Sequence, residues 1–579
     1  MPRQRHREYQ LSAEEMLQFL DFADSDEEGL FELDEEDEEL LEQSFPQPGE
    51  SPKTIQILDP LVTDVNEQQT PEMTIDHRKW TRKFPANMPS VGSQQDKEWG
   101  KIQLDYEDTP TPLDVFQDVC KLDELIDNIL VPQSIVYTQQ KGIPFKIEKN
   151  EMKAFIGINI MMSYHVLPEL RDYFSNEPDL RVQPIAETMT RDRMYSIRKA
   201  LHFSDNSKAP DKLQNSFYDR AWKIRPLIDH FNAAFQNAMS PTFEQAIDER
   251  MVKFKGQNIM KQYMKDKPIQ RGFKHWCRND AKSGYLFEFD IYVGRRTSTT
   301  EVGLSESVVT QLTKSLSNSG CHLFFDNFYT SPALVYRLMR DSKIFSCGTV
   351  RQNRKGLPKD LKLDKELKKG EIEARYYNGM SLVKWLDTKV VMMLSTIDSG
   401  IETNTVSVKR RQKGKSGKVD IQVPAMVQRY NKFMRGTDLL DQKTNVYAFD
   451  RKSPGKYYCR PFWDYIDMGI VNSFIVYQKI LAKAARNKQE KLAKTQKDFR
   501  REIALSLIGN FSSRKKQTPN IRKQNNSERH RIHYAEKHGR CRQCYVKEKM
   551  DHKGFIKCLD CDVYLCLNKN RNCWEKYHE

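Results

Sequence analysis

The spacing of apolar and polar residues changes along the chain, and the changes mark its segments. From about residue 100 to 235, apolar residues recur every three or four positions, as in "PLDVFQDVCKLDELIDNIL" and "YDRAWKIRPLIDHFNAAFQNAM". This spacing predicts amphipathic helices. At residue 242 the pattern begins to alternate, first in "TFEQAIDERMVKFKG" and then in "GYLFEFDIYVG", "CHLFFDNFY" and "IFSCGTV", with a helical "SPALVYRLMRDS" between the last two. Strands mixed with a helix predict an α/β sheet.

The pattern changes twice more before the C-terminus. The segment from 350 to 430 is basic, polar and strand-rich, as in "EARYYNGMSLVKWLD", with "KRRQKGKSGK" as an exposed loop. Helical spacing then resumes in "RYNKFMRGTDLLDQ" and "RPFWDYIDMGIVNSFIVYQKILAKAAR". The prediction is a multidomain α/β plus α chain. Its segments are a disordered acidic region (1–95), a helical domain (96–235), the first part of an α/β domain (236–349), a β-rich insertion (350–430), the last part of that domain with further helices (431–485), a basic linker (486–535) and a cysteine-rich domain (536–579).

Charge is distributed unevenly. The formal net charge is +13, yet residues 1–50 hold 3 Lys/Arg against 17 Asp/Glu, so the other 529 residues carry +27. A basic body favours a polyanionic partner, either nucleic acid or an acidic membrane surface. The acidic block "DSDEEGLFELDEEDEELLEQ" is either a solvating tail or an arm that binds protein partners or competes with nucleic acid for the basic body.

Membrane insertion and secretion are not expected. No apolar run approaches the roughly 18 residues of a membrane span, and the first residues, "MPRQRHREYQ", lack the apolar core of a secretory signal. We therefore expect an intracellular protein. Residues 481–540 hold 17 Lys/Arg against 5 Asp/Glu, and are either a nuclear import signal and DNA anchor or a solvated linker.

Acidic residues follow apolar strands at positions that suggest a metal site. Asp326 ends the predicted strand in "LFFDNFYTS", and Asp248 lies on a strand of the same predicted sheet in "AIDERMVKF". Asp438 and Asp441, three residues apart in "GTDLLDQ", share one helix face. Asp is rarely buried unless it is paired or holds a metal, and a few carboxylates suffice for Mg²⁺ or Mn²⁺. The alternative is that each Asp only forms a turn at a strand end.

The cysteines crowd at the C-terminus. Six of the 11 fall within residues 541–573. In a reducing compartment this crowding predicts zinc rather than disulfides. With His578, they give the seven expected ligands Cys541, Cys544, Cys558, Cys561, Cys566, Cys573 and His578. Seven ligands predict two cross-braced zinc sites, with an eighth ligand from His552 or His538 and the pairing left open.

Six motifs in order resemble the piggyBac transposase family, which includes piggyBac transposable element-derived proteins. They are "AIDERMVKFKGQ", "KPIQRGFKHWC", "LFFDNFYTS", "CGTVRQNRKGLPKDL", "YNKFMRGTDLLDQ" and "CDVYLC…CWEKYH". The resemblance runs from about residue 100 to the end. It implies an RNase H-like catalytic domain with a β-rich insertion before the last catalytic acid, and a DDE/D transposase that uses divalent metal at TTAA sites.

The resemblance also assigns residues and partners. The catalytic acids fall on Asp248, Asp326 and Asp438, and Asp441 matches a further functionally important acid. The implied chemistry is attack by water and then by a 3′-hydroxyl on phosphorus. The implied partners are transposon ends, TTAA target DNA and a second copy of the chain, and the implied location is the nucleus. The cysteine-rich segment would recognise transposon ends, and its Lys547, Lys549, Lys553 and Lys557 suit phosphate contacts.

Two departures from the family pattern bear on function. Arg435-Gly436 stands where many members have Gly-Gly, and Tyr457-Tyr458 where many have a Trp that stacks near the DNA end. Tyr457 would be a weaker stacking platform, flanked by Lys456 and Arg460 as phosphate ligands, or else a core aromatic. Two alternatives to an active transposase follow: a domesticated DNA-binding protein without catalysis, and an adaptor that uses the acidic arm and zinc module.

Overall fold

The computed structural model describes ten ranges of the chain: 75–84, 98–210, 218–265, 267–294, 303–398, 404–411, 417–449, 456–484, 494–513 and 530–578. They fall into two compact units, residues 1–511 and residues 512–579. Most of the acidic region predicted to be disordered, and the centre of the predicted loop "KRRQKGKSGK", lie outside the described residues.

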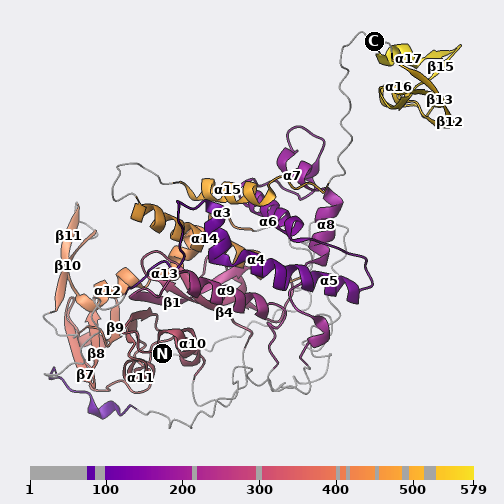
Figure 1. Ribbon diagram of the computed structural model, residues 1–579. Coiled ribbons are helices and arrows are strands. Elements are labelled where there is room, and N and C mark those ends of the chain that lie inside the picture. The colour runs from indigo at the N-terminus through magenta and orange to yellow at the C-terminus, as the bar shows by residue number, and fades with distance from the viewer. Residues whose placement is uncertain are drawn as a thin grey trace, which may run out of the picture. The chain divides into compact units, whose positions relative to one another are not determined.

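A layer of helices forms between residues 112 and 238, as the spacing of apolar residues predicts (Figure 1). Its first helix begins with a capping box, in which Thr111 and Asp114 satisfy each other's backbone N–H groups, and Pro112 fits the first turn. The helices are α3 (Pro112–Cys120), α4 (Leu122–Leu125), α5 (Val131–Gln140), α6 (Lys149–Tyr164), α7 (Gln183–Thr188), α8 (Arg191–Ala200) and α9 (Arg225–Ala238), with a π-helical turn (Ile126–Leu130) before α5.

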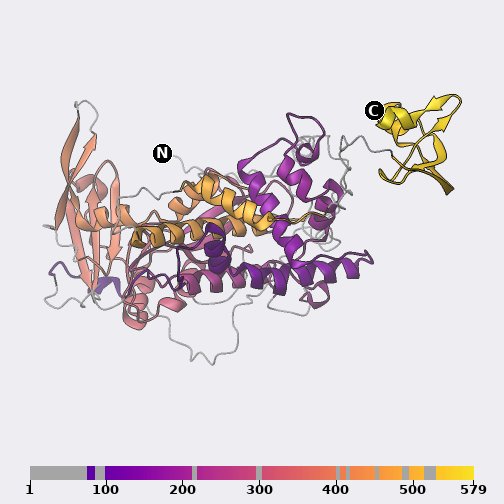
Figure 2. The ribbon, with the colours of Figure 1, turned by 45° about the horizontal axis from the view of Figure 1, so that its top comes forward.

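Helix α14 (Cys459–Ala484) also belongs to this layer (Figure 2). It is buried along most of its length and packs on α3 and α9. Helix α15 (Gln496–Ile508) packs on α6, where Ala504, Leu507 and Ile508 lie against Gly157. The prediction that 486–535 is only a basic linker is therefore wrong for α15, whose charged residues surround an apolar face.

A nine-stranded sheet packs against these helices. Strand β1 (Glu244–Lys253) pairs antiparallel with β3 (Arg271–Asp280) on one side and parallel with β5 (His322–Phe325) on the other. The order β4-β3-β1-β5-β6, antiparallel on one side of β1 and parallel on the other, is the expected RNase H-like arrangement. The remaining elements of this part are β2 (Lys261–Tyr263), β4 (Leu286–Ile291), β6 (Phe345–Thr349), α10 (Leu304–Leu312) and α11 (Pro332–Ser342).

The β-rich insertion continues this sheet. Strand β9 pairs antiparallel with β6, and β8 and β7 follow it outward. Among the described strands of the insertion, β10 and β11 pair with each other as a separate hairpin. The chain then enters two helices that return to the centre of the sheet. The elements are β7 (Ile372–Tyr377), β8 (Met380–Leu386), β9 (Val390–Ser395), β10 (Thr405–Arg411), β11 (Lys418–Pro424), α12 (Ala425–Phe433) and α13 (Gly436–Asn445).

A short segment at 75–84 covers the outer edge of β7. Thr81 and Tyr376 exchange two backbone hydrogen bonds of 2.9 Å, and the Trp80 indole N–H donates to the Gly356 carbonyl at 2.9 Å. The prediction of disorder for residues 1–95 is wrong for these residues, because a buried Trp and a strand bridge hold them.

The second unit is small, and thiols form much of its core. Its buried cluster is Leu565 with four cysteines. Such a core is too small to fold a domain by apolar burial alone. The elements are β12 (Ile532–Arg540), α16 (Arg542–Lys547), β13 (Lys553–Cys558), β14 (Val563–Tyr564), β15 (Leu567–Asn568), β16 (Arg571–Asn572) and α17 (Cys573–His578). Within the described ranges of both units, none of the helices combines the length and apolar content needed to cross a membrane.

Candidate active site and metal centres

Strand register places Asp248 beside Asp326. In the parallel pair, Ile247 lies opposite Phe325, so the next residue on each strand is an aspartate. Neighbouring strands are about 4.8 Å apart. Backbone N–H groups orient both carboxylates: Glu249 donates to Asp248 Oδ1, and Phe328 donates to Asp326 Oδ1, each at 2.8 Å.

Helix α13 brings Asp438 to the same region (Figure 1). Its first residue, Gly436, lies so close to the sheet that a Cβ there would be 3.2 Å from the Ala246 Cβ and 3.0 Å from the Asn279 Cβ. Asp438 follows in the first turn, where the helix dipole favours an acid. Arg435 has φ −83°, which any residue adopts, so only the second glycine of the family pattern is needed here.

Lys267 is a cation that interacts with these acids. Its Nζ donates to the Glu249 carbonyl at 3.1 Å and lies 3.9 Å from Glu249 Oε1. Burial alone would lower the pKa of Lys267, but the carboxylates of Asp248, Glu249, Asp441 and Asp438 raise it. Acids from β1 and α13 therefore converge on one ammonium group.

The site disfavours several negative charges at once. Burial raises the pKa of Asp248 to about 8, with Glu249 and Asp326 adding to the effect and Lys267 opposing it. Burial also raises the pKa of Asp326. A divalent cation would relieve both effects, and hard carboxylate oxygens suit Mg²⁺ or Mn²⁺. The acids are not among the groups of described side chains whose ligand atoms all lie within 4.8 Å of one another.

Sequence reasoning missed two residues of this site. Glu249 was detectable, because it follows Asp248 directly, and it accepts a hydrogen bond from the Tyr329 hydroxyl at 3.3 Å. Lys267 is the first residue of the family motif "KPIQRGFKHWC", but it was not singled out because it lies after β2 in a segment without clear periodicity. Asp441 lies on α13 as expected, but its Oδ1 pairs with Arg250 Nε at 2.8 Å.

The predicted DNA contacts beside α14 are engaged within the protein. Tyr457 is 5% exposed and belongs to the helical core, which favours its interpretation as a core aromatic. Arg460 is buried and donates to the carbonyls of Lys253 and Phe449. Lys456 donates to the Lys199 carbonyl and lies over the Tyr137 ring. All three side chains are therefore engaged within the protein, and their contact with DNA stays a prediction.

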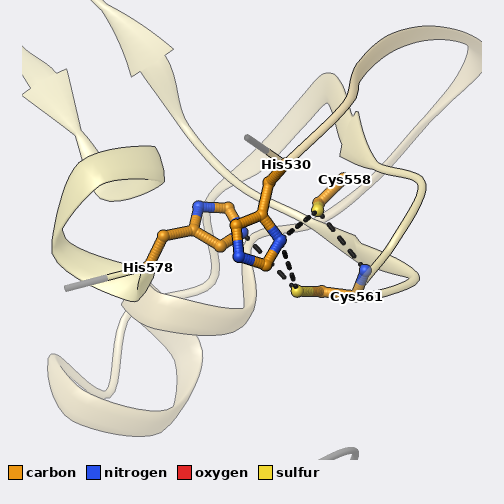
Figure 3. Close-up of side chains that lie close together, drawn as sticks. All are labelled: His530, Cys558, Cys561 and His578. Atoms are coloured by element: carbon orange, nitrogen blue, oxygen red, sulfur yellow. Dashed lines mark hydrogen bonds between the residues drawn. The ribbon is translucent and has the colours of Figure 1, made fainter. Parts of the chain in front are cut away.

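Two four-residue groups in the second unit have the composition of metal sites. The first is Cys541, Cys544, Cys566 and Cys573, and the second is His530, Cys558, Cys561 and His578. Within each group the ligand atoms lie within 4.8 Å of one another. The two groups alternate along the chain, which is the cross-braced arrangement expected from the sequence. Figure 3 shows the second group, where His530 Nδ1 lies 3.4 Å from Cys561 Sγ and 3.7 Å from Cys558 Sγ.

The eighth ligand position belongs to His530. The expectation of His552 or His538 is wrong: His552 Nδ1 lies 2.7 Å from Arg571 Nη1, and the His538 ring packs against Phe555. His530 precedes β12, so the predicted start of the cysteine-rich domain at residue 536 excluded this candidate metal ligand. A histidine eleven residues before Cys541 carries no spacing signal of its own.

The donors of both groups fit zinc. Burial and neighbouring sulfurs raise the pKa of Cys573 to about 12 and that of Cys561 to about 11. A dication stabilises the thiolates. The His578 Nδ1 lies 2.8 Å from the Trp574 carbonyl, which fixes the ring and leaves Nε2 facing Cys561 at 3.6 Å.

The lysines of this unit differ in availability. Lys547, Lys549 and Lys553 are exposed. Lys557 pairs with Asp562 at 2.5 Å. Three of the four predicted phosphate ligands are therefore on the surface.

Comparisons with known proteins agree with this geometry. The family model described as Transposase IS4 matches residues 111–474. PiggyBac transposable element-derived protein 3 of Homo sapiens is 30% identical over 380 residues, which cover 64% of this chain and 61% of that protein. PiggyBac transposable element-derived protein 2 of Homo sapiens is 27% identical over 437 residues, covering 73% of this chain and 71% of that protein.

A solved structure has the same fold. The cryo-EM structure of a piggyBac transposase synaptic complex with hairpin DNA matches with a TM-score of 0.61 and 23% identity, over 81% of this chain and 98% of that chain. The chain spans less than two thirds of the first of these relatives. The match over residues 111–474, the relatives and the shared fold together show that the chain belongs to the piggyBac transposase family.

Proposed function

We propose that this protein is a nuclear DDE/D transposase, or a derived protein with its acid set intact, that cleaves and joins DNA strands at TTAA sites. The observation that supports it most is the register of β1 and β5, which sets Asp248 beside Asp326, with α13 delivering Asp438. Asp248, Asp326 and Asp438 would hold Mg²⁺ or Mn²⁺, which supplies Lewis acidity and activates the attacking oxygen. The aspartates orient that oxygen, and no covalent protein nucleophile is needed.

The second unit would bind DNA. With zinc in both Cys/His groups, the exposed Lys547, Lys549 and Lys553 would contact phosphates. The solved piggyBac transposase is a synaptic complex with hairpin DNA. By analogy we propose transposon ends as the partner of this chain, handled by a homodimer because two ends must be joined.

The experiment should not depend on knowing the end sequence. Full-length protein with Mg²⁺ is incubated with a duplex library that carries TTAA followed by random sequence, and newly released 3′ ends are sequenced. We expect 3′ ends at the TTAA boundary, reduced to background by Asp248→Asn, Asp326→Asn or Asp438→Asn. Asp341→Asn is the matched control, because Asp341 is an exposed acid on α11 paired with Arg340.

Three outcomes decide the proposal. Salt-sensitive DNA binding without new 3′ ends would overturn the enzyme and favour a DNA-binding protein without catalysis. Binding that does not weaken as salt rises would contradict phosphate contacts by the lysines. Cleavage that survives Asp248→Asn would place the chemistry elsewhere.

A further inference from the structure

Helix α13 lies along one face of β1. Side chains two residues apart on a strand point to the same side, so Ala246, Asp248 and Arg250 share the face that α13 covers. Gly436 contacts Ala246 at one end of the helix. Asp441 and Thr444 contact Arg250 at the other end. Asp248 therefore lies beneath the middle of the helix.

Arg250 joins three elements. Its Nε donates to Asp441 Oδ1 at 2.8 Å, its Nη2 to Thr444 Oγ1 at 3.3 Å, and its Nη1 to Asp464 Oδ2 of α14 at 2.5 Å. The guanidinium is only 2% exposed. A buried guanidinium with fixed partners resists displacement, because moving it away from its two carboxylate partners would leave a buried charge unpaired.

The contacts of Gly436 with Ala246 and of Thr444 with Arg250 fix the position of α13 along β1. From Gly436 to Thr444 a helix rises about 12 Å, and from Ala246 to Arg250 a strand extends about 13 Å. Helix and strand are therefore held in register at both ends. A slip of α13 would carry Asp438 away from Asp248.

Asp438 and Asp441 differ in what they contact. Among the described residues, Asp438 makes no hydrogen bond or ion pair and is exposed at the start of the helix. The Oδ1 of Asp441 already accepts a hydrogen bond from the buried Arg250 guanidinium. The first carboxylate is available to a cation, and the second is used by the protein.

We infer that Asp441 is a positioning residue: it fixes α13 on β1 through Arg250, so that Asp438 meets Asp248, and it is not a metal ligand. The inference rests on the proposed function for the role of Asp438. The anchoring by Arg250 stands on its own contacts.

The first test compares two Asp→Asn variants in full-length, zinc-loaded protein. Mn²⁺ binding is followed by the electron paramagnetic resonance signal of free Mn²⁺. Asp438→Asn should weaken Mn²⁺ binding at least tenfold. Asp441→Asn, whose amide oxygen still accepts from Arg250, should stay within threefold of wild type. Equal weakening by both would overturn the inference.

The second test needs neither metal nor DNA. Amide hydrogen exchange over residues 436–445 should accelerate at least tenfold in Arg250→Met and in Asp441→Ala, and less in Asp441→Asn. Arg340→Met on the exposed face of α11 is the control and should leave α13 unchanged. Unchanged exchange in both Arg250→Met and Asp441→Ala would overturn the anchor. Failure of wild type to bind Mn²⁺ would instead contradict the proposed function, with the anchor decided separately by exchange.

Discussion

The four aspartates of the candidate site differ in burial, pKa and pairing because their neighbours differ. Asp248 and Asp326 are half-buried beside other acids, and this partial burial raises the pKa of both. Asp438 stands exposed at a helix start, and Asp441 pairs with Arg250. The sequence predicted a cluster of Asp248, Asp326 and one of the pair Asp438 and Asp441. It could not separate their roles, because the partner that distinguishes Asp441 is a strand residue 191 positions away.

At the residue scale, Gly436 lets α13 pack close to the sheet, and we expect a larger residue there to destabilise unit 1. Gly436→Ala would put a Cβ 3.0 Å from the Asn279 Cβ and 3.1 Å from the Asp280 carbonyl oxygen, so the helix or the sheet must shift by a few tenths of an ångström. We expect unit 1 to lose about 1–3 kcal/mol of unfolding free energy in urea, and DNA cleavage to fall with it. Gly303→Ala at the start of α10, where nothing lies within 4 Å, is the control. Equal stability of the two variants would show that α13 does not need this close approach.

At the element scale, sequence periodicity predicted strands that are apolar and missed one that is polar. Strands β1 and β5 were found from their alternating or apolar residues. Strand β3 was not, because its buried His275 and Arg278 carry polar side chains. Both side chains are paired inside the fold: His275 Nε2 lies 2.9 Å from the Tyr465 hydroxyl, and Arg278 donates to Gln245 and Glu288. Internal pairing of polar groups is invisible to a pattern of hydrophobicity.

Helix α15 was also missed, because it lies within a segment of basic composition. Its packing leads to a testable prediction at the element scale. Phe499 is fully buried against Phe474 and Tyr477 of α14, whereas Leu505 on the same helix is 39% exposed. Phe499→Ala should lower the unfolding free energy of unit 1 by about 3–5 kcal/mol in urea. Leu505→Ala should change it by less than about 1 kcal/mol. A linker without tertiary packing would show no difference between the two.

At the scale of the whole molecule, the two units are stabilised differently. In unit 1, one apolar cluster joins the helical layer to β1, β3 and β4 and to helices α13 and α14, so we expect segments that the sequence divided at 235 and 431 to unfold together. The insertion was predicted as a separate segment because its strands follow one another in the sequence. The pairing of β9 with β6 shows that they extend the central sheet. Unit 2 has mainly thiols and imidazoles at its centre.

That difference predicts how each unit responds to metal loss. Purified protein should contain two Zn²⁺ per chain by elemental analysis, and His530→Ala or His578→Ala should reduce the content to one, because each removes a ligand of the same group. His538→Ala and His552→Ala should keep two. A strong chelator should raise amide exchange throughout 530–578, since a small zinc domain has no folded state to retain without its ions, and should leave the unfolding of unit 1 unchanged. Two Zn²⁺ in His530→Ala together with one in His552→Ala would return the eighth ligand position to His552.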